Sequence, residues 1–289
     1  MATEIDTRTD TRTDTRNDTK NGTATDTRYL FETGSDHGRV QVDCLSAMLD
    51  STTTGVLDDL GVREGWRCLE LGAGNGSVAR WMAQRVGPTG SVAAVDIDTR
   101  HLDPAPGVTA YRHDVNDDLP EDGPFDVIHA RMLLMHLSRR EEILRTLAGA
   151  LAPGGWLVVT DVSDRLPTAA AGIDPGPAEL FDRVLDTGMN RVGRPAGMNL
   201  EWARDVGRHL RDAGLEDIHG LEDAFTARGG TPAMLYYRSL IKQLEEPLQA
   251  AGLTTDDMRQ FCDLVTDPQF SAWSYQFVTT WARRPTTRR

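Results

Sequence analysis

The sequence has few of the residues that build disulfide frameworks, metal sites or membrane spans. Its 289 residues include three cysteines, Cys44, Cys68 and Cys262, and their wide spacing predicts neither a disulfide framework nor a metal site. No apolar run approaches the roughly 20 residues that cross a bilayer, and no signal-peptide core follows Met1. We therefore expect a cytoplasmic protein without a membrane partner.

Positive charge is also scarce. The chain has 31 Lys and Arg residues against 44 Asp and Glu residues, which gives a formal net charge of -13. Nucleic-acid backbones are bound by clusters of basic side chains. The charge balance therefore argues against a nucleic-acid partner.

The beginning of the chain has almost no apolar side chains. Residues 4–28 are a degenerate repeat built on Asp-Thr-Arg-Thr. Such a segment cannot bury enough surface to offset the entropy that is lost on ordering. We expect residues 1–28 to be a disordered low-complexity tail.

What the sequence does contain is a strand, a glycine-rich turn and a helix in succession. The short apolar run Arg67–Leu71 holds one acid, Glu70, and is followed by glycines at alternate positions, Gly72, Gly74 and Gly76. A helix-like stretch follows directly. Glycines let the backbone approach a ligand, and the N-terminus of a helix facing that turn is a favourable place to bind one.

A second acid lies at the end of the next predicted strand, as it does in the nucleotide-binding half of an α/β sheet. The run Ser91–Val95 predicts the next strand, which ends in Asp96, 26 residues after Glu70. An acid at the tip of the second strand accepts hydrogen bonds from ribose hydroxyls in folds of this kind. The two acids and the helix between them indicate a nucleoside-containing cofactor.

The Gly-x-Gly-x-Gly spacing preceded by an acid resembles motif I of the class I S-adenosylmethionine-dependent methyltransferases. Strands predicted at 108–111, 125–131 and 151–161, with a Pro153-Gly154-Gly155 turn, also resemble this family, and the resemblance covers residues 56–163 closely. It implies an α/β, Rossmann-like, seven-stranded sheet with helices on both faces.

Four segments resemble methyltransferases of actinobacterial secondary metabolism in particular: Tyr29–Phe31, Gly65–Glu70, Asp96–Arg100 and His129–His136. Members of that group methylate O, N or C atoms of aromatic, indole-containing or polyketide compounds. The resemblance implies S-adenosyl-L-methionine as the cofactor, S-adenosyl-L-homocysteine as the product, and a small-molecule substrate, as in antibiotic biosynthesis.

The resemblance also implies which residues contact the cofactor. Asp96 would hold the ribose, Asp114 and Val115 the adenine, and Glu70 would face the cofactor through water or the loop amides, the alternative being a structural hydrogen bond that holds the loop. The expected cofactor-binding residues are Glu70, Gly72, Ala73, Gly74, Gly76, Asp96, Ile97, Asp114, Val115, Ala130 and Arg131.

The segments outside the core are expected to cover the site. Residues 29–62 predict a helical lid, with helices over 40–49 and 57–62. Residues 63–163 form the cofactor-binding core, and 164–289 hold substrate-capping helices, inserted after strands five and six, and the final antiparallel strands. The expected elements there are helices over 181–189, 202–215 and 232–253, and strands over 218–227 and 274–281.

Methyl transfer from a sulfonium is an in-line displacement, in which positioning can supply about 7–11 kcal/mol of barrier reduction. A general base, typically worth about 10²–10⁴-fold, is therefore useful but optional. We select two catalytic candidates, His136 in the helix expected after the fourth strand and Tyr29 in the lid. A structural role is the alternative for each of them.

Other histidines are weaker candidates. His37 and His209 could also act as bases, whereas His129 is expected to be packed or partnered within its strand.

Other functions stay open at this point. Some proteins of this fold catalyse ring formation while they retain the cofactor, so a cyclase, with or without methylation, is the alternative. A nicotinamide oxidoreductase is disfavoured, because Ser77 stands where the dinucleotide fingerprint has glycine or alanine. The substrate, the methylated atom and a homodimeric state are left open.

Deleting residues 1–24 should leave the melting temperature and the cofactor affinity almost unchanged, because the repeat contributes nothing to a core. Scanning calorimetry and titration calorimetry with S-adenosylmethionine measure these two quantities. A large fall in either quantity would mean that the repeat is ordered over the site or across a dimer.

Overall fold

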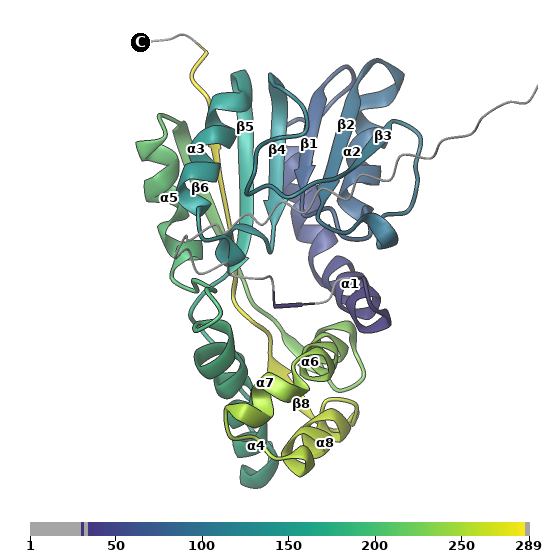
Figure 1. Cartoon of the computed structure of the whole chain (residues 1–289), viewed down its shortest axis with the longest axis vertical. Helices are drawn as coiled ribbons and strands as arrows, with labels where there is room; N and C mark the ends of the chain where they lie inside the picture. Colours follow the sequence, from purple (N-terminus) through teal and green to yellow (C-terminus); the bar gives the residue numbers. More distant parts are fainter. Residues whose placement is uncertain (1–29, 32–33, 287–289) are drawn as a thin grey trace, which may run out of the picture.

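The computed structural model describes residues 30–31 and 34–286 and contains one large sheet with helices packed around it (Figure 1). The predicted tail and Tyr29 lie outside these residues. In spatial order the strands are β3 (Val108–Arg112), β2 (Ser91–Asp96), β1 (Arg67–Leu71), β4 (Phe125–Arg131), β5 (Leu151–Val162), β9 (Phe277–Arg283) and β6 (Glu216–Asp223). Neighbouring strands are parallel except at β9, which is antiparallel to β5 and β6. This confirms the predicted sheet.

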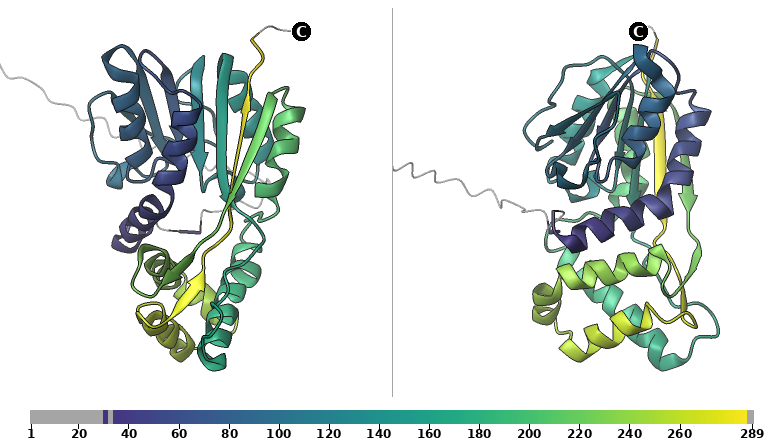
Figure 2. Two further views of the ribbon diagram at one scale, coloured as in Figure 1. Left: turned by 180° about the vertical axis from the view of Figure 1, so that it is seen from behind. Right: turned by 90° about the vertical axis from the view of Figure 1, so that its right-hand side faces the viewer.

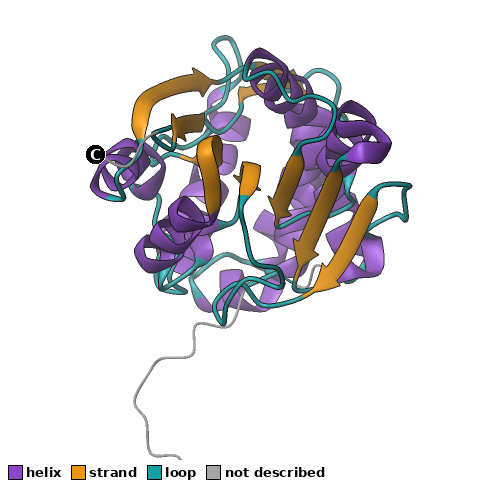
Figure 3. Cartoon of the chain, turned by 90° about the horizontal axis from the view of Figure 1, so that it is seen from above, coloured by secondary structure: helices purple, strands orange, loops and turns teal. Residues whose placement is uncertain are grey.

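The central strands are buried on both faces, which explains their nearly continuous apolar sequences. Alternate residues belong to two separate cores: Cys68 and Val127 lie in one, and Leu69 and Ile128 lie in the other. Figure 3 shows helices on both faces of the sheet. The helices that cover it are α2 (Ser77–Val86), α3 (Arg140–Ala150) and α5 (Trp202–Asp212). Short 3₁₀ turns, η1 (Gly87–Thr89) and η2 (Thr99–His101), flank β2.

The lid is one long helix, α1 (Asp36–Asp59), capped at its N-terminus by the Ser35 hydroxyl. The prediction of two helices was wrong. Residues 51–54, Ser-Thr-Thr-Thr, are poor helix formers, but tertiary contacts hold this stretch: Thr52 donates to Asp223 at 2.9 Å, and Thr53 accepts from Arg131 at 3.0 Å. Packing therefore overrides local propensity here.

A second group of elements forms a cap beyond the carboxyl ends of the parallel strands (Figure 1). Figure 2 shows α6 of this cap lying alongside α1. The elements of the cap are α4 (Pro175–Asp186), a π-helical segment η4 (Thr187–Gly193), α6 (Pro232–Gln243), α7 (Glu245–Ala250), α8 (Thr255–Leu264), and the paired strands β7 (Thr226–Arg228) and β8 (Ser271–Trp273). Among the described helices, none combines the length and the apolar character that a membrane crossing requires.

Several predicted boundaries in the second half of the chain were wrong. The helix predicted over 232–253 is interrupted between α6 and α7. Pro247 accounts for the break, because proline has no N–H and its ring clashes with the carbonyl four residues earlier, at Gln243. The strand predicted over 218–227 divides into β6 and β7, and the one predicted over 274–281 begins at Phe277. Sequence patterns gave no indication that β7 and β8 form a sheet of their own.

Candidate active site

The predicted site residues converge at the carboxyl edge of the parallel strands, where ligands bind in open α/β sheets. The glycine turn after β1 is the centre of this edge. Gly72, Gly74 and Gly76 have φ angles of 69°, 55° and 77°, values that favour glycine because a side chain would be strained there. The N–H groups of Gly72 and Ala73 both donate to the Val95 carbonyl, at 2.9 and 3.0 Å. The turn is thereby fixed against β2, and the Gly76 N–H, which donates to the Ala73 carbonyl at 2.8 Å, closes it.

Asp96 is tied directly to this turn. Its Oδ2 accepts from the Gly74 N–H at 2.8 Å, and its Oδ1 accepts from the Asp98 N–H at 3.0 Å. Burial raises the pKa of Asp96 above its usual range, and backbone hydrogen bonds from Asp98, Gly74 and Ile97 oppose the shift. A carboxylate offers about four lone-pair positions, so acceptor capacity remains for a ribose. Next to it, the Ile97 side chain is 48% exposed and offers an apolar surface.

The next acid, Asp114, lies after β3. Its Oδ1 accepts from the N–H and the side-chain amide of Asn116, at 2.9 and 3.0 Å, while Val115 is buried beside it. The turn, Asp96, Ile97 and Asp114 follow the tips of three adjacent strands. This arrangement fits a nucleoside: glycine backbone, a carboxylate with spare acceptor capacity and an exposed apolar side chain.

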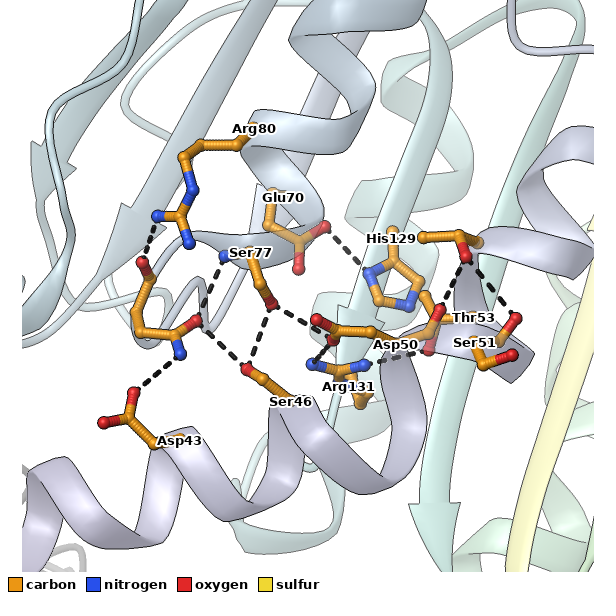
Figure 4. A network of polar contacts seen from close by, with 12 residues as sticks. Asp43, Ser46, Asp50, Ser51, Thr53, Glu70, Ser77, Arg80, His129 and Arg131 are labelled. Carbon is orange, nitrogen blue, oxygen red and sulfur yellow. Dashed lines mark hydrogen bonds and ion pairs between the residues drawn. The ribbon is translucent and has the colours of Figure 1, made fainter.

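Glu70 has a partner that the sequence did not indicate. Its Oε2 lies 2.8 Å from His129 Nδ1, and both side chains are at most 3% exposed (Figure 4). Glu70 and His129 are register partners in the parallel pair β1–β4, so both point to the same face. The Nε2 atom of His129 is buried without a hydrogen bond to any described residue. Glu70 was expected to face the cofactor through water or the loop amides, or else to hold the loop by a structural hydrogen bond; its hydrogen bond is to His129 on the neighbouring strand β4.

A polar network joins α1 to the glycine turn and to β4. Arg131 donates to Asp50 Oδ1 at 2.9 Å, and the same oxygen accepts from the Ser77 hydroxyl at 3.1 Å. Figure 4 shows Asp50, Ser46 and Asp43 projecting from α1 toward the turn. Ser46 bonds Ser77 and Asn75, both at 3.0 Å, and Asn75 donates to Asp43 at 2.9 Å.

None of these α1 residues was selected from the sequence. The signal was present, since positions 43, 46 and 50 fall on one face of a helix. We name Asp43, Ser46, Asp50, Asn75, Ser77 and Arg131 the lid network. Arg131 lies within it, whereas the Ala130 side chain is 1% exposed in the core, so any cofactor contact of Ala130 would use its backbone.

The chain turns sharply after β4. Met132 has a φ of 54°, which is unusual for a residue with a long side chain, and its N–H donates to the Thr160 carbonyl at 2.7 Å. The helix predicted to start here was wrong: a single 3₁₀ turn, η3 (Leu134–His136), comes first, and α3 starts only at Arg140. Strain of this kind is often retained at functional sites, and here it directs the chain toward a cavity.

That cavity, the acceptor pocket, lies between α1, the ends of β4 and β5, and the cap. It encloses about 400 Å³ of space without protein atoms, part of it open to solvent. The residues that line it are Phe31, Gln41, Leu45, Met132, His136, Val162, Met189, Met198, Tyr236, Leu240 and Tyr275.

His136 lies in the wall of this pocket. Its ring meets Phe31 edge to face, with centroids 6.1 Å apart. Burial, assisted by the positive charge of Arg140, lowers the pKa of His136 to about 4. The imidazole is therefore neutral at physiological pH and able to accept a proton.

Of the other catalytic candidates, Tyr29 is outside the described residues. His37 is exposed in the first turn of α1, and His209 packs on Trp202 with ring centroids 4.8 Å apart. Within residues 30–31 and 34–286, no group of three His, Cys, Asp or Glu side chains could hold a metal ion.

Asp161 is a buried acid that the sequence analysis did not select. It lies near the end of β5, is 1% exposed, and neither carboxyl oxygen has a hydrogen bond to a described residue. Burial raises the pKa of Asp161 to about 8, against the opposing influence of the Met135 and Leu133 N–H groups and of Arg140. The side chain is thus mostly a neutral acid at pH 7, behind the turn that carries His136.

Sequence and structure comparisons agree on the type of protein that this chain resembles. Residues 31–220 match a family described as a methyltransferase domain. Methyltransferase str2 of Strobilurus tenacellus is 32% identical over 186 residues, which cover 58% of this chain and 66% of the relative. The 27-O-demethylrifamycin SV methyltransferase of Amycolatopsis mediterranei is 31% identical over 261 residues, covering 83% and 86%. The chain therefore spans just under two thirds of the first relative and most of the second.

Solved structures show the same fold. A protein of Bacillus halodurans assigned as a methyltransferase superposes with a TM-score of 0.52 at 16% identity, over 82% of this chain and 100% of that chain. The phosphoethanolamine N-methyltransferase 2 of Haemonchus contortus, in complex with S-adenosyl-L-methionine, gives a TM-score of 0.50 at 18% identity, over 81% and 52%.

Replacing Asp96 with alanine should weaken the binding of S-adenosylhomocysteine by about 5–150-fold, because two ribose hydroxyls and the Gly74 N–H would lose their acceptor. Titration calorimetry measures the change. Asp118→Ala, in an exposed loop, is the matched control. An unchanged dissociation constant for the Asp96 variant would refute its role.

Replacing Asp161 with asparagine should make stability less dependent on pH. A carboxyl whose folded pKa is raised to about 8 contributes stability that is present below pH 3.8 and is lost as the pH rises through 8. We expect the variant to gain about 3 °C or more in melting temperature relative to the parent between pH 6 and pH 9. Asp164 is exposed, so Asp164→Asn should show no such gain. If the melting temperatures of the parent and the Asp161 variant changed in parallel with pH, Asp161 would not be a buried neutral acid.

Proposed function

The chain belongs to the class I S-adenosylmethionine-dependent methyltransferases, and from this premise we propose that it methylates an O, N or C atom of a small aromatic or indole-containing secondary metabolite. S-adenosylmethionine is its cofactor and S-adenosylhomocysteine its product. The observation that carries the proposal is a neutral histidine in the wall of an enclosed, mostly apolar pocket, at the same sheet edge as the glycine turn. The name of one relative supports it, since that enzyme is a 27-O-demethylrifamycin SV methyltransferase.

The residues fit the cofactor in chemical type. Asp96 would hold the ribose, Ile97, Asp114 and Val115 the adenine, and the backbone of 72–76 the methionine part. When bound, S-adenosylmethionine supplies an electrophilic methyl group on a sulfonium. The protein contributes the placement of the acceptor and the exclusion of water, which together account for most of the rate in such displacements.

The pocket walls provide that placement. Leu45 of α1, Leu240 of α6 and Val162 of β5 enclose the acceptor from three directions. Apolar walls of this kind confine a ligand in one place and keep competing water away.

His136 is the group that can take a proton from the acceptor. Its pKa of about 4 would make it a weak base toward a free hydroxyl, but the proton becomes much more acidic as the oxygen gains its methyl group. Bound S-adenosylmethionine would supply the methyl group to an acceptor oxygen, and His136 would hold the proton that the acceptor releases before it passes to solvent. Because the proton is lost as the bond to carbon forms, a base of low pKa can still accept it, although a pKa near the operating pH is the most effective.

Replacing His136 with glutamine should lower turnover about 10²–10⁴-fold while substrate affinity is nearly kept, because glutamine retains hydrogen bonding but cannot accept a proton. Turnover is measured as S-adenosylhomocysteine formed with a methylated metabolite detected by mass spectrometry. The parent rate should be flat with pH above about 5, since His136 is deprotonated there.

His219→Gln is the matched control, because His219 is exposed on the edge strand β6. If the His136 variant turned over like the parent while remaining folded, catalysis would rest on positioning alone. A product of unchanged mass, without S-adenosylhomocysteine, would instead indicate the cyclase alternative.

A further inference from the structure

We propose that the acceptor pocket selects an uncharged aromatic hydroxy compound, of the phenol type, and excludes cationic and anionic substrates. This inference rests on the proposed function and specifies its substrate class. It concerns binding in the pocket, so it can be tested apart from turnover.

Among the residues that the structure describes, the lining of the pocket contains no charged side chain. Of its eleven residues, none is Asp, Glu, Lys or Arg. Two cations near the pocket are already paired. Arg131, which precedes Met132, donates to Asp50 at 2.9 Å. The Arg140 guanidinium donates to the carbonyls of Leu134, Met135 and Gly197 at 2.9–3.3 Å. A charged group that entered would lose its hydration without gaining a counter-ion, which is costly in an apolar site.

The polar groups that do line the pocket are neutral. His136 is deprotonated at neutral pH, and burial raises the pKa of Tyr236 and Tyr275 well above their usual range, so both phenols stay protonated. Tyr275 is 3% exposed. Gln41 is 4% exposed and its Oε1 accepts from Gln243 at 2.8 Å. Neutral donors and acceptors of this kind suit a hydroxyl ligand and leave an ion unpaired.

The remaining walls favour a flat ring. Three thioethers, those of Met132, Met189 and Met198, surround the space together with Phe31. Methionine sulfur makes favourable contacts with aromatic rings, and its unbranched chain adapts to ligands of different outline. These contacts favour a flat aromatic part in the acceptor.

The test compares three probes with one skeleton: 2-naphthol, 2-naphthoate and 2-naphthylmethylammonium. Each is titrated calorimetrically into the full chain saturated with S-adenosylhomocysteine at pH 7. We expect 2-naphthol to bind at least about 10-fold more tightly than either ion, since an unpaired buried charge costs well over the equivalent of a tenfold change. Equal affinities, tighter binding of an ion, or no binding of 2-naphthol would overturn the proposal.

A charge introduced into the wall should invert this preference. Gln41→Glu keeps the shape of the side chain and should improve the affinity for the ammonium probe relative to 2-naphthol by about 10-fold or more. Gln249→Glu, exposed on α7, adds the same charge far from the pocket and should change nothing. Met198→Glu, at a half-buried position in the same wall, is the second variant if the first fails to fold. An unchanged ratio in a folded variant would show that the probes bind elsewhere.

The two proposals fail in different ways. Methylation of a cationic or anionic metabolite would overturn the uncharged substrate class and leave the methyltransferase proposal intact. Selective binding of 2-naphthol without methylation of any aromatic compound would support the pocket and count against the proposed function.

Discussion

The ion pair between Asp50 and Arg131 joins the three elements from which the site is built. Arg131 is the last residue of β4, Asp50 lies in the middle of α1, and Asp50 also accepts from Ser77 at the start of α2. The Arg131 side chain is only 10% exposed. Removing one partner would leave a largely buried charge, which is strongly destabilising. Because this pair holds α1 against the sheet, it also holds Gln41 and Leu45 of the same helix in the wall of the acceptor pocket.

Much of the core could be predicted from the sequence, because its signals are local. The apolar runs that became β1, β2 and β4, and the alternate glycines from Gly72 to Gly76, depend only on neighbouring residues. Elements whose conformation depends on distant partners were predicted less well. The Thr-rich middle of α1 is helical because Asp223 and Arg131 bind it, and neither residue is near it in the sequence. Pro247, by contrast, was a local signal that should have ended α6.

The residues of the site likewise divide into those with a local signal in the sequence and those whose role depends on distant partners. Asp96 could be selected because an acid after the second strand has a position that the fold fixes, and His136 because it follows the fourth strand. The contact between Glu70 and His129 depends on strand register across 59 positions, which periodicity does not give. The buried, largely neutral state of Asp161 depends on how η3 and α5 close over the end of β5. Such properties arise from packing, so they could not be predicted from residue type.

The site separates polar from apolar chemistry by means of α1. At 100° per residue, Gln41 and Leu45, which line the pocket, fall on nearly the opposite face from Asp43, Ser46 and Asp50, which bind the glycine turn. The two sides meet at the end of β4, where Arg131 joins the lid network and the next residue, Met132, lines the pocket. Met132 has a left-handed backbone and is the first residue after β4. A cofactor held by the polar side and an acceptor held by the apolar side would come together at that point. If the backbone of Met132 relaxed to an ordinary conformation, the pocket wall and His136 would move together. The strain at Met132 would therefore have a physical role in placing the acceptor.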